Sequence, residues 1–217
     1  MLAPQNLTVL VDYDSGNLHS AEKAFQRMAA ETGGGRVIVT SDPDLVAKAD
    51  RIVLPGDGAF PACRQALTDH TGLFEAIHEA VTQRARPFLG ICVGMQMLAT
   101  TGREYQDTSG FGWIDGDVVR IAPADPALKV PHMGWNDLVI DTPHPVLAGI
   151  ETGDHAYFVH SYHFRTAGPA DLLAHVDYAG PITAIVGRAN IVGTQFHPEK
   201  SQATGLRLIA NFLGWRP

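Results

Sequence analysis

A short stretch in the middle of the chain constrains the fold more than any other feature. An apolar run that begins at Phe88 ends abruptly in Gly90-Ile91-Cys92-Val93-Gly94, and the helix-compatible residues 95–99 follow at once. This pattern is typical of a β-strand that turns sharply into a helix with a nucleophile at the turn. The two glycines are needed because a side chain at either position would collide with a neighbouring strand or helix. We therefore expect a strand-turn-helix unit that holds Cys92 in a strained, exposed position.

The chemistry of Cys92 follows from this placement. A free thiol titrates near ~8.5, so a small fraction is thiolate at neutral pH, and a helix N-terminus or an imidazolium increases that fraction. The alternative is a buried core cysteine, which is the commoner role of an isolated cysteine. A core cysteine requires neither the flanking glycines nor the switch from strand to helix. The pattern therefore favours a nucleophile.

The composition is that of one globular domain, which we place at residues 1–217. Hydrophobic residues make up 45% of the chain and charged residues 18%, as in an ordinary folded protein. A formal charge of -7 without a basic stripe argues against a nucleic-acid partner. No run approaches the ~18 apolar residues of a membrane span. Cys63 and Cys92 make no disulfide framework and Met1–Gln5 has no signal-peptide pattern, so we expect a cytoplasmic protein.

The first half of the chain alternates strand-like and helix-like segments. Such alternation predicts a doubly wound, flavodoxin-like α/β fold with a mostly parallel sheet and helices on both faces. In these sheets the ligand crevice lies beyond the carboxyl ends of the strands, where Asn17, Gly56 and Cys92 follow strands. The expected strands are 7–11, 36–40, 51–54 and 88–92, with helical spacing at 18–28, 42–46 and 73–81.

The second half has strand-like segments with short turns and no helices between them. We expect an added antiparallel or mixed β region there, followed by a closing helix around residues 206–213. The expected strands are 118–121, 135–139, 156–159, 172–176, 182–186 and 191–196.

Two glycine-rich segments resemble phosphate-binding loops and need separate interpretations. Gly33-Gly34-Gly35 follows a helix and precedes a strand, the reverse of a phosphate loop, so we interpret it as a linker turn. In the segment 55–61, Pro61 stands where a dinucleotide fingerprint has its third glycine, which excludes that fingerprint. A loop of this composition after a strand can instead present backbone N–H groups to an anion.

A cysteine nucleophile needs an imidazole to carry a proton and an acid to orient the imidazole. His197-Pro198-Glu199 follows the last strand directly. With Pro198 holding the middle residue extended, the two neighbouring side chains project to one side. The other strand and turn histidines are expected on the surface or satisfied in the core, and their spacing indicates no metal site. Those histidines are His132, His144, His155, His160, His163 and His175.

With these motifs in view, the chain resembles the class I, triad-type glutamine amidotransferases, and within them the glutaminase subunits of imidazole glycerol phosphate synthases. The segments 90–96 and 197–199 are similar to the wider class alone. The narrower resemblance is carried by Asp12-Tyr13-Asp14-Ser15-Gly16-Asn17-Leu18, Pro55-Gly56-Asp57-Gly58-Ala59-Phe60, Pro131-His132-Met133-Gly134-Trp135-Asn136 and Phe158-Val159-His160-Ser161-Tyr162.

The resemblance implies a reaction and the residues that perform it. Cys92 would attack the side-chain amide of L-glutamine to form a γ-glutamyl thioester and release ammonia, with His197 as proton carrier and Glu199 as its orienting acid. No cofactor is implied. The oxyanion hole would be built from backbone N–H groups of Val93, Gly56 and Asp57.

Further site residues are implied by the same resemblance. The substrate would be held by Gly58, Gln96, Glu104, Ser161 and Tyr162. A (β/α)₈ cyclase subunit, forming a heterodimer with this chain and receiving the ammonia, would be contacted by Asn17, Met133, Trp135 and Lys200. From the residues alone, a solvated helix-end charge is the alternative for Glu104, and burial in the core is the alternative for Trp135.

One residue departs from the family pattern. The family usually has an apolar residue where Asp57 stands, and a carboxylate aimed at the sulfur would disfavour the thiolate. We therefore expect the Asp57 side chain to point away from the sulfur, toward solvent or the partner. Two other functions stay open: the glutaminase of another triad amidotransferase, such as that of pyridoxal phosphate synthesis, and a non-catalytic regulatory module of the same fold.

Overall fold

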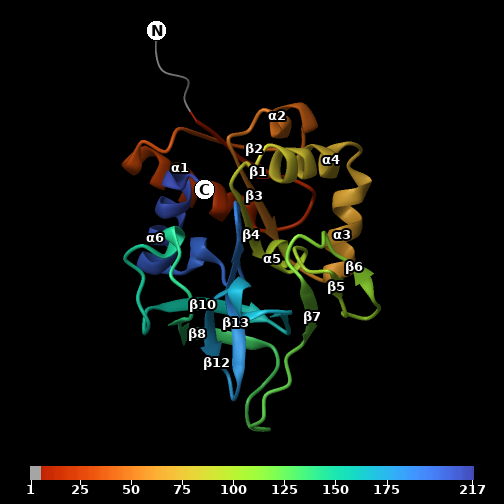
Figure 1. Ribbon diagram of the computed structural model, residues 1–217, viewed down its shortest axis with the longest axis vertical. Helices are drawn as coiled ribbons and strands as arrows, with labels where there is room; N and C mark the ends of the chain where they lie inside the picture. Colours follow the sequence, from red (N-terminus) through yellow and green to blue (C-terminus); the bar gives the residue numbers. More distant parts are fainter. Residues whose placement is uncertain (1–5) are drawn as a thin grey trace.

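A computed structural model describes residues 6–217, and Met1–Gln5, where we expected no signal peptide, lies outside the described residues. The central sheet has the strand order β2-β1-β3-β4-β14-β13-β12-β9, and it is parallel from β2 to β14 and antiparallel beyond (Figure 1). The fold is the flavodoxin-like α/β arrangement that the sequence predicted. The strands are β1 (Leu7–Val11), β2 (Arg36–Thr40), β3 (Arg51–Gly56), β4 (Phe88–Cys92), β14 (Ile191–Thr194), β13 (Pro181–Arg188), β12 (Leu172–Asp177) and β9 (Val139–Ile140).

The middle strands of the sheet are buried along their whole length. Every residue of β3, β4 and β14 is buried, because helices cover both faces of the sheet. Helices α1 (Leu18–Thr32) and α6 (Gln202–Gly214) pack against each other on one face. The other face carries α2 (Pro43–Ala47), α3 (Phe60–Asp69), α4 (Leu73–His78), continued by a π-helical turn over Glu79–Gln83, and α5 (Val93–Gln96) (Figure 1).

Helix α1 illustrates how local sequence sets the element boundaries. The Asn17 side chain accepts a hydrogen bond from the Ser20 N–H at 3.4 Å and caps the start of the helix. The helix ends where Gly33 adopts a left-handed conformation with φ 71°, which glycine adopts without steric cost. The triple glycine is therefore the linker turn that the sequence predicted.

Two smaller sheets extend the molecule beyond the carboxyl ends of the parallel strands (Figure 1). One pairs β8 (His132–Asp137) with β10 (His155–His160). The other has the order β11-β7-β5-β6, with bounds Tyr162–Thr166, Gly116–Arg120, Thr101–Gly102 and Thr108–Ser109. The added antiparallel and mixed β region and the closing helix are confirmed, and 3₁₀ turns at Pro145–Leu147 and Pro169–Asp171 interrupt the region.

The sequence did not predict α3 or β11. Helix α3 buries Phe60, Cys63 and Leu67 at helical spacing. Pro61 occupies its first turn, where a proline fits because the first N–H groups have no intrahelical partner. The start of α3 was not predicted because we interpreted the segment 55–61 only as a loop.

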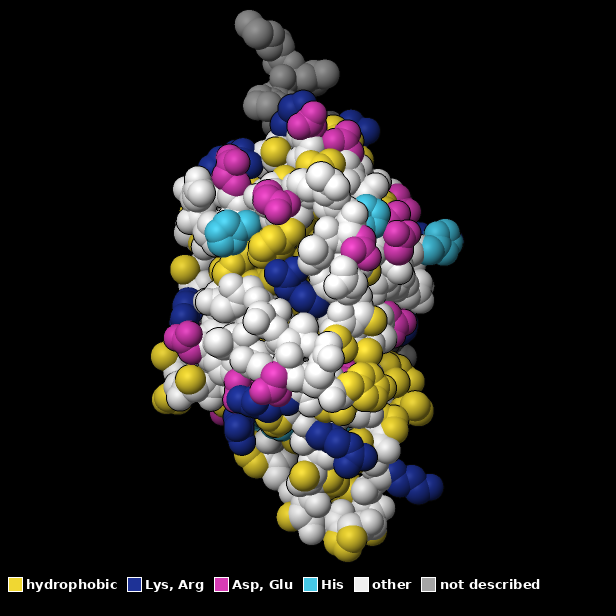
Figure 2. Space-filling model, turned by 90° about the vertical axis from the view of Figure 1, so that its right-hand side faces the viewer, with side chains coloured by type: hydrophobic (Ala, Val, Ile, Leu, Met, Phe, Trp, Pro, Cys, Tyr) yellow, Lys and Arg dark blue, Asp and Glu magenta, His cyan; other side chains and the backbone are white. Residues whose placement is uncertain are grey.

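On the face on the α3–α4 side, acidic and basic side chains are interspersed, and hydrophobic side chains gather in one patch at the right edge, below the middle of the view (Figure 2). Within residues 6–217, no helix has both the length and the apolar character required to cross a bilayer.

Candidate active site

The register of three adjacent strands brings the predicted catalytic segments together. Gly56 of β3 lies beside Cys92 of β4, and Thr194 of β14 lies beside Ile91. The residues that follow these strands therefore meet at one edge of the sheet. The structure thus explains how Asp57, Cys92 and His197, which are far apart in the sequence, come to share one site.

Cys92 occupies a strained turn between β4 and α5. Its φ is 56° and its ψ is −112°, a backbone conformation that costs free energy for a residue with a side chain. A Cβ atom added at Gly90 would lie 2.6 Å from the Gly94 carbonyl carbon, and one at Gly94 would overlap the backbone of Leu54 on β3. The predicted steric need for both glycines is confirmed. The expected exposure is not, because Cys92 is buried and lines a cavity.

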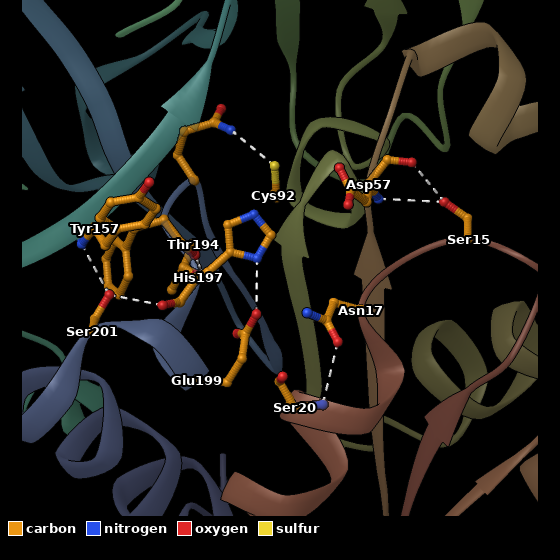
Figure 3. Close-up of polar contacts among 12 residues, drawn as sticks. Ser15, Asn17, Ser20, Asp57, Cys92, Tyr157, Thr194, His197, Glu199 and Ser201 are labelled. Atoms are coloured by element: carbon orange, nitrogen blue, oxygen red, sulfur yellow. Dashed lines mark hydrogen bonds and ion pairs between the residues drawn. The ribbon is translucent and has the colours of Figure 1, made fainter. Parts of the chain in front are cut away.

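His197 and Glu199 form the expected imidazole–carboxyl pair. The His197 Nδ1 atom and the Glu199 Oε1 atom are 2.9 Å apart, and the two side chains are 5% and 2% exposed. Figure 3 places the His197 ring between Cys92 and Glu199. The predicted reason was wrong: Pro198 does not hold an extended strand but begins a 3₁₀ turn over Pro198–Lys200, and this turn carries Glu199 back to the ring.

Ser201 fixes the backbone of this turn. Its hydroxyl donates to the His197 carbonyl at 2.7 Å and accepts from the Tyr157 N–H at 3.0 Å (Figure 3). Ser201 is 1% exposed, so water does not compete for these hydrogen bonds. The His197 main chain is therefore tied to strand β10 as well as to β14.

The electrostatics of the site favour a charged imidazole. Burial by itself lowers the pKa of His197, but hydrogen bonds and charge interactions with the Cys92 and Glu199 side chains outweigh it and raise the pKa to about 10. His197 is therefore protonated at neutral pH. An imidazole that can carry a proton beside a cysteine sulfur is the pairing that nucleophilic attack on an acyl group requires.

A cavity of about 250 Å³ opens in front of Cys92, smaller than the roughly 300–1,000 Å³ of pockets for drug-sized ligands. Its volume suits a molecule of amino-acid size. All five predicted substrate residues line it together with Cys92. The lining residues are Asp57, Gly58, Cys92, Val93, Gln96, Glu104, Pro131, Val159, His160, Ser161 and Tyr162.

Two of these side chains are held by hydrogen bonds to the protein, and these bonds determine which of their polar atoms are free to bind a ligand. Glu104 Oε2 accepts from the Phe60 N–H at 2.8 Å, which fixes the carboxylate at the start of α3. Gln96 Nε2 donates to the Tyr162 carbonyl at 3.0 Å and to Gln195 Oε1 at 3.1 Å. Both of its N–H bonds are thus used, and Gln96 Oε1 is the atom left to accept from a ligand.

The loop after β3 is held by residues that the sequence did not single out. The Asp57 N–H donates to Ser15 Oγ at 3.3 Å, and the Asp57 carbonyl accepts from Ser15 Oγ at 2.9 Å (Figure 3). The same carbonyl accepts from Cys63 Sγ at 3.3 Å. In this conformation the Asp57 N–H is directed at Ser15. Gly56 is buried at the end of β3 and is not among the described residues that line the cavity.

The Asp57 side chain is exposed, and the residue lines the same cavity as Cys92. The expectation that its carboxylate points away from the sulfur remains a prediction.

The residues predicted to contact a partner lie outside this cavity. Met133 and Trp135 project from β8 and are 62% and 46% exposed, so Trp135 is not a core residue. Asn17 is exposed at the start of α1, and Lys200 lines a cleft between α1 and α6. All four side chains are accessible on the surface.

The sequence missed Gln195, whose amide contacts the Cys92 sulfur at 3.7 Å, and His160, which lines the cavity. Gln195 immediately precedes Phe196-His197 at the end of a buried strand. A polar residue in that apolar setting was the available signal. Only the structure reveals its partner, because the contact joins residues 103 apart in the chain.

Comparisons with known proteins agree with this geometry. Residues 9–214 match the family model "Glutamine amidotransferase class-I". The chain is 76% identical to "Imidazole glycerol phosphate synthase subunit HisH" of Cereibacter sphaeroides, over 97% of this chain and 100% of that protein. It is 61% identical to the protein of the same name from Rhodospirillum rubrum, over 96% of this chain and 98% of that one.

Solved structures show the same fold at low sequence identity. One, described as a glutamine amidotransferase, has a TM-score of 0.71 and 18% identity over 95% of this chain and 99% of that chain. Another, a glutamine amidotransferase from Thermotoga maritima, has a TM-score of 0.62 and 15% identity over 91% and 77% of the two chains. The family match and the identities above show that this chain belongs to the class I glutamine amidotransferases and, within them, to the HisH subunits of imidazole glycerol phosphate synthase.

Proposed function

We propose that this chain is the glutaminase subunit of an imidazole glycerol phosphate synthase and acts in histidine biosynthesis. It hydrolyses L-glutamine to glutamate and ammonia and supplies the ammonia to a cyclase subunit. The observation that carries the proposal is the placement of Cys92 at the wall of an amino-acid-sized cavity, with the buried His197–Glu199 pair behind it. A non-catalytic module would have no need of a charged, buried imidazole beside a strained cysteine.

The first half-reaction forms a thioester. The Cys92 thiolate attacks the side-chain amide carbon of glutamine, and the carbonyl oxygen becomes an oxyanion. The protonated His197 then donates its Nε2 proton to the leaving nitrogen, the carbon–nitrogen bond breaks, and ammonia departs. Glu199 keeps the other proton on Nδ1 through the 2.9 Å contact, so that Nε2 is the atom that exchanges protons.

The second half-reaction reverses the proton transfer. Neutral His197 takes a proton from water, the hydroxide attacks the thioester carbon, and the carbon–sulfur bond breaks. Glutamate leaves, and Cys92 and His197 return to the thiolate and imidazolium pair.

The oxyanion needs hydrogen-bond donors, each worth about a hundredfold or more in rate. The Val93 N–H is the first of α5 and has no partner within the helix. The Asp57 N–H is a second candidate, and it must leave Ser15 before it can donate to the oxyanion. Release of this N–H would therefore raise turnover.

The cavity walls suit the amino-acid end of glutamine. The Glu104 carboxylate and the free Gln96 Oε1 atom both accept hydrogen bonds and would hold the α-ammonium group. Ser161, Tyr162 and Gly58 complete the walls of this pocket.

We further propose that the partner is a (β/α)₈ cyclase subunit in a cytoplasmic 1:1 complex. The exposed Met133 and Trp135 side chains of β8 would form part of the contact surface, because aromatic residues and methionine are enriched in interfaces. Asn17 and Lys200 would extend it toward α1. The names of the curated relatives speak against a role in pyridoxal phosphate synthesis.

The test is ammonia release from glutamine by the purified chain, with and without its cyclase and the cyclase ligand. We expect little release by the chain alone, strong release in the complex, and none from Cys92→Ala in either state. Glutamine-independent cyclase activity that uses added ammonia, together with no glutamine hydrolysis in the complex, would contradict the proposal and indicate a non-catalytic module.

A further inference from the structure

The Cys92 sulfur has a second polar neighbour besides His197. Gln195 Nε2 lies 3.7 Å from Cys92 Sγ, a contact drawn as the dashed line that ends at Cys92 in Figure 3. Gln195 is completely buried. Water therefore cannot take the place of its amide, and the direction in which that amide points matters for the charge on the sulfur.

The direction of the Gln195 amide follows from its other contact. Gln96 Nε2 donates to the Tyr162 carbonyl, which can only accept, so the Gln96 amide has one possible orientation. The same Nε2 donates its second hydrogen to Gln195 Oε1. With its oxygen engaged there, Gln195 must present its NH₂ group, a donor, to the sulfur.

The Tyr162 carbonyl is itself held by a second donor. His160 Nδ1 lies 2.8 Å from that oxygen and must donate to it. Burial, with smaller contributions from neighbouring groups, lowers the pKa of His160 to about 3, so the ring is neutral and its Nε2 atom is an acceptor. His132 Nδ1, 3.1 Å away, therefore donates to His160.

The chain of hydrogen bonds ends on strand β8. Burial lowers the pKa of His132 to about 4, so His132 is neutral too, and its Nε2 accepts from Asn136 Nδ2 at 3.2 Å. Asn136 Nδ2 also donates to the Asp177 carbonyl at 2.9 Å, which fixes the orientation of that amide. Each donor in this series has an acceptor, and each ring has a single allowed tautomer.

We propose that Gln195 is a further catalytic residue of the glutaminase reaction and donates a hydrogen bond to the Cys92 thiolate. His160 and His132 are positioning residues, because they hold the Tyr162 carbonyl on which the orientation of the Gln195 amide depends. A donor fixed in advance stabilises the sulfur whenever it carries charge, in the attacking thiolate and again as the thioester breaks. This inference rests on the proposed function for the reaction, but the contact with the sulfur is independent of it.

The first test replaces Gln195 with methionine, which has similar volume and no N–H donor. The rate of Cys92 alkylation by iodoacetamide at pH 7 is measured by peptide mass mapping, which separates Cys92 from Cys63. We expect a loss of about tenfold or more in alkylation rate and in kcat of the complex, with KM for glutamine within about twofold. Gln65→Met, at an exposed position of α3, is the matched control and should leave both rates unchanged.

The second test separates positioning from packing at His132. Asparagine can place its Nδ2 donor where His132 Nδ1 lies, whereas leucine cannot. We expect His132→Leu to slow alkylation and turnover severalfold and His132→Asn to restore most of the loss. If Gln195→Met does not fold, Gln195→Asn, which withdraws the amide by one methylene group, must give the same loss.

Unchanged alkylation and kcat in a folded Gln195→Met variant would overturn the inference while leaving the glutaminase proposal intact. Absence of ammonia release by the wild-type complex would refute the glutaminase proposal instead, and the alkylation rates would still report on Gln195. Equal rates for His132→Leu and His132→Asn would remove the positioning role.

Discussion

Replacing Gly90 with alanine tests whether the turn at Cys92 is set by backbone packing. The new Cβ would lie 2.6 Å from the Gly94 carbonyl carbon and 2.7 Å from the Met95 nitrogen. Carbon atoms in contact prefer about 3.5 Å or more, so β4 and the start of α5 must separate by about 0.9 Å. These two atoms and the Gly94 carbonyl oxygen, which the Cβ would also overlap, are all backbone atoms of α5, so no side-chain rotation relieves the overlap. Cys92 lies between the two elements and must move with them.

A displacement of about 1 Å at a reacting group lowers activity by about a hundredfold, and overpacking of this kind lowers the free energy of unfolding by about 1–3 kcal/mol. We therefore expect Gly90→Ala to fold, with a lower urea midpoint, and to lose about two orders of magnitude in kcat/KM for glutamine in the complex. Gly168→Ala is the control, because a Cβ there meets nothing within 4 Å. If Gly90→Ala had wild-type kcat/KM and stability, the steric account of the turn would be refuted.

Four further predictions address the site and its support. Because the Cys92 side chain helps to raise the pKa of His197 to about 10, Cys92→Ala should lower that pKa in an NMR titration of the ring; an unchanged value would show that the sulfur and ring do not interact. Because the pKa of His197 lies above its ordinary 6.5, the folded state binds this proton more tightly than the unfolded state, and the binding stabilises the fold. The stabilisation is complete below pH 6.5 and is lost as the pH rises toward 10. The urea midpoint should therefore fall over this window in the wild type and fall less in Cys92→Ala. Glu104→Gln should raise KM for glutamine about tenfold with kcat nearly unchanged, since it would remove the charge-assisted contact that we propose Glu104 makes to the α-ammonium. A fall in kcat alone would assign Glu104 another role. Asn190→Ala should lower the free energy of unfolding by about 1–3 kcal/mol without changing kcat. The reason is that the buried Asn190 Nδ2 donates to two backbone carbonyls at 2.9 and 2.8 Å. An unchanged free energy of unfolding in chemical denaturation would show that these two hydrogen bonds do not stabilise the fold.

Local patterns in the sequence sufficed for the parallel half of the fold. Fully apolar runs such as Phe88–Cys92 and helical spacing in Leu18–Thr32 depend on neighbours a few residues away, and both elements formed where expected. The start of α3 was hidden because Pro61 is compatible with a loop and with a first helical turn. Which interpretation holds depends on burial of Phe60 and Leu67, which tertiary packing decides.

In the candidate site too, the sequence predicts some features and not others. The placement of Cys92, His197 and Glu199 near neighbouring strand ends could be predicted because the proposed chemistry requires those residue types there. The turn that joins His197 to Glu199 could not be predicted correctly, since the extended and 3₁₀ conformations are both open to Pro198. The contacts of Ser15 with Asp57 and of Gln195 with Cys92 span 42 and 103 residues, and only the folded arrangement of the strands brings those residues together.

Covalent trapping measures the central claim most directly. A chloroketone analogue of glutamine, incubated with the complex and followed by peptide mass mapping, reports which thiol attacks a substrate-like ligand in the cavity. We expect the adduct on Cys92 alone, formed much more slowly in His197→Gln and blocked by excess glutamine. An adduct on Cys63 instead, or labelling of Cys92 that neither glutamine nor His197→Gln affects, would contradict the assignment of Cys92 and His197 as the reacting pair.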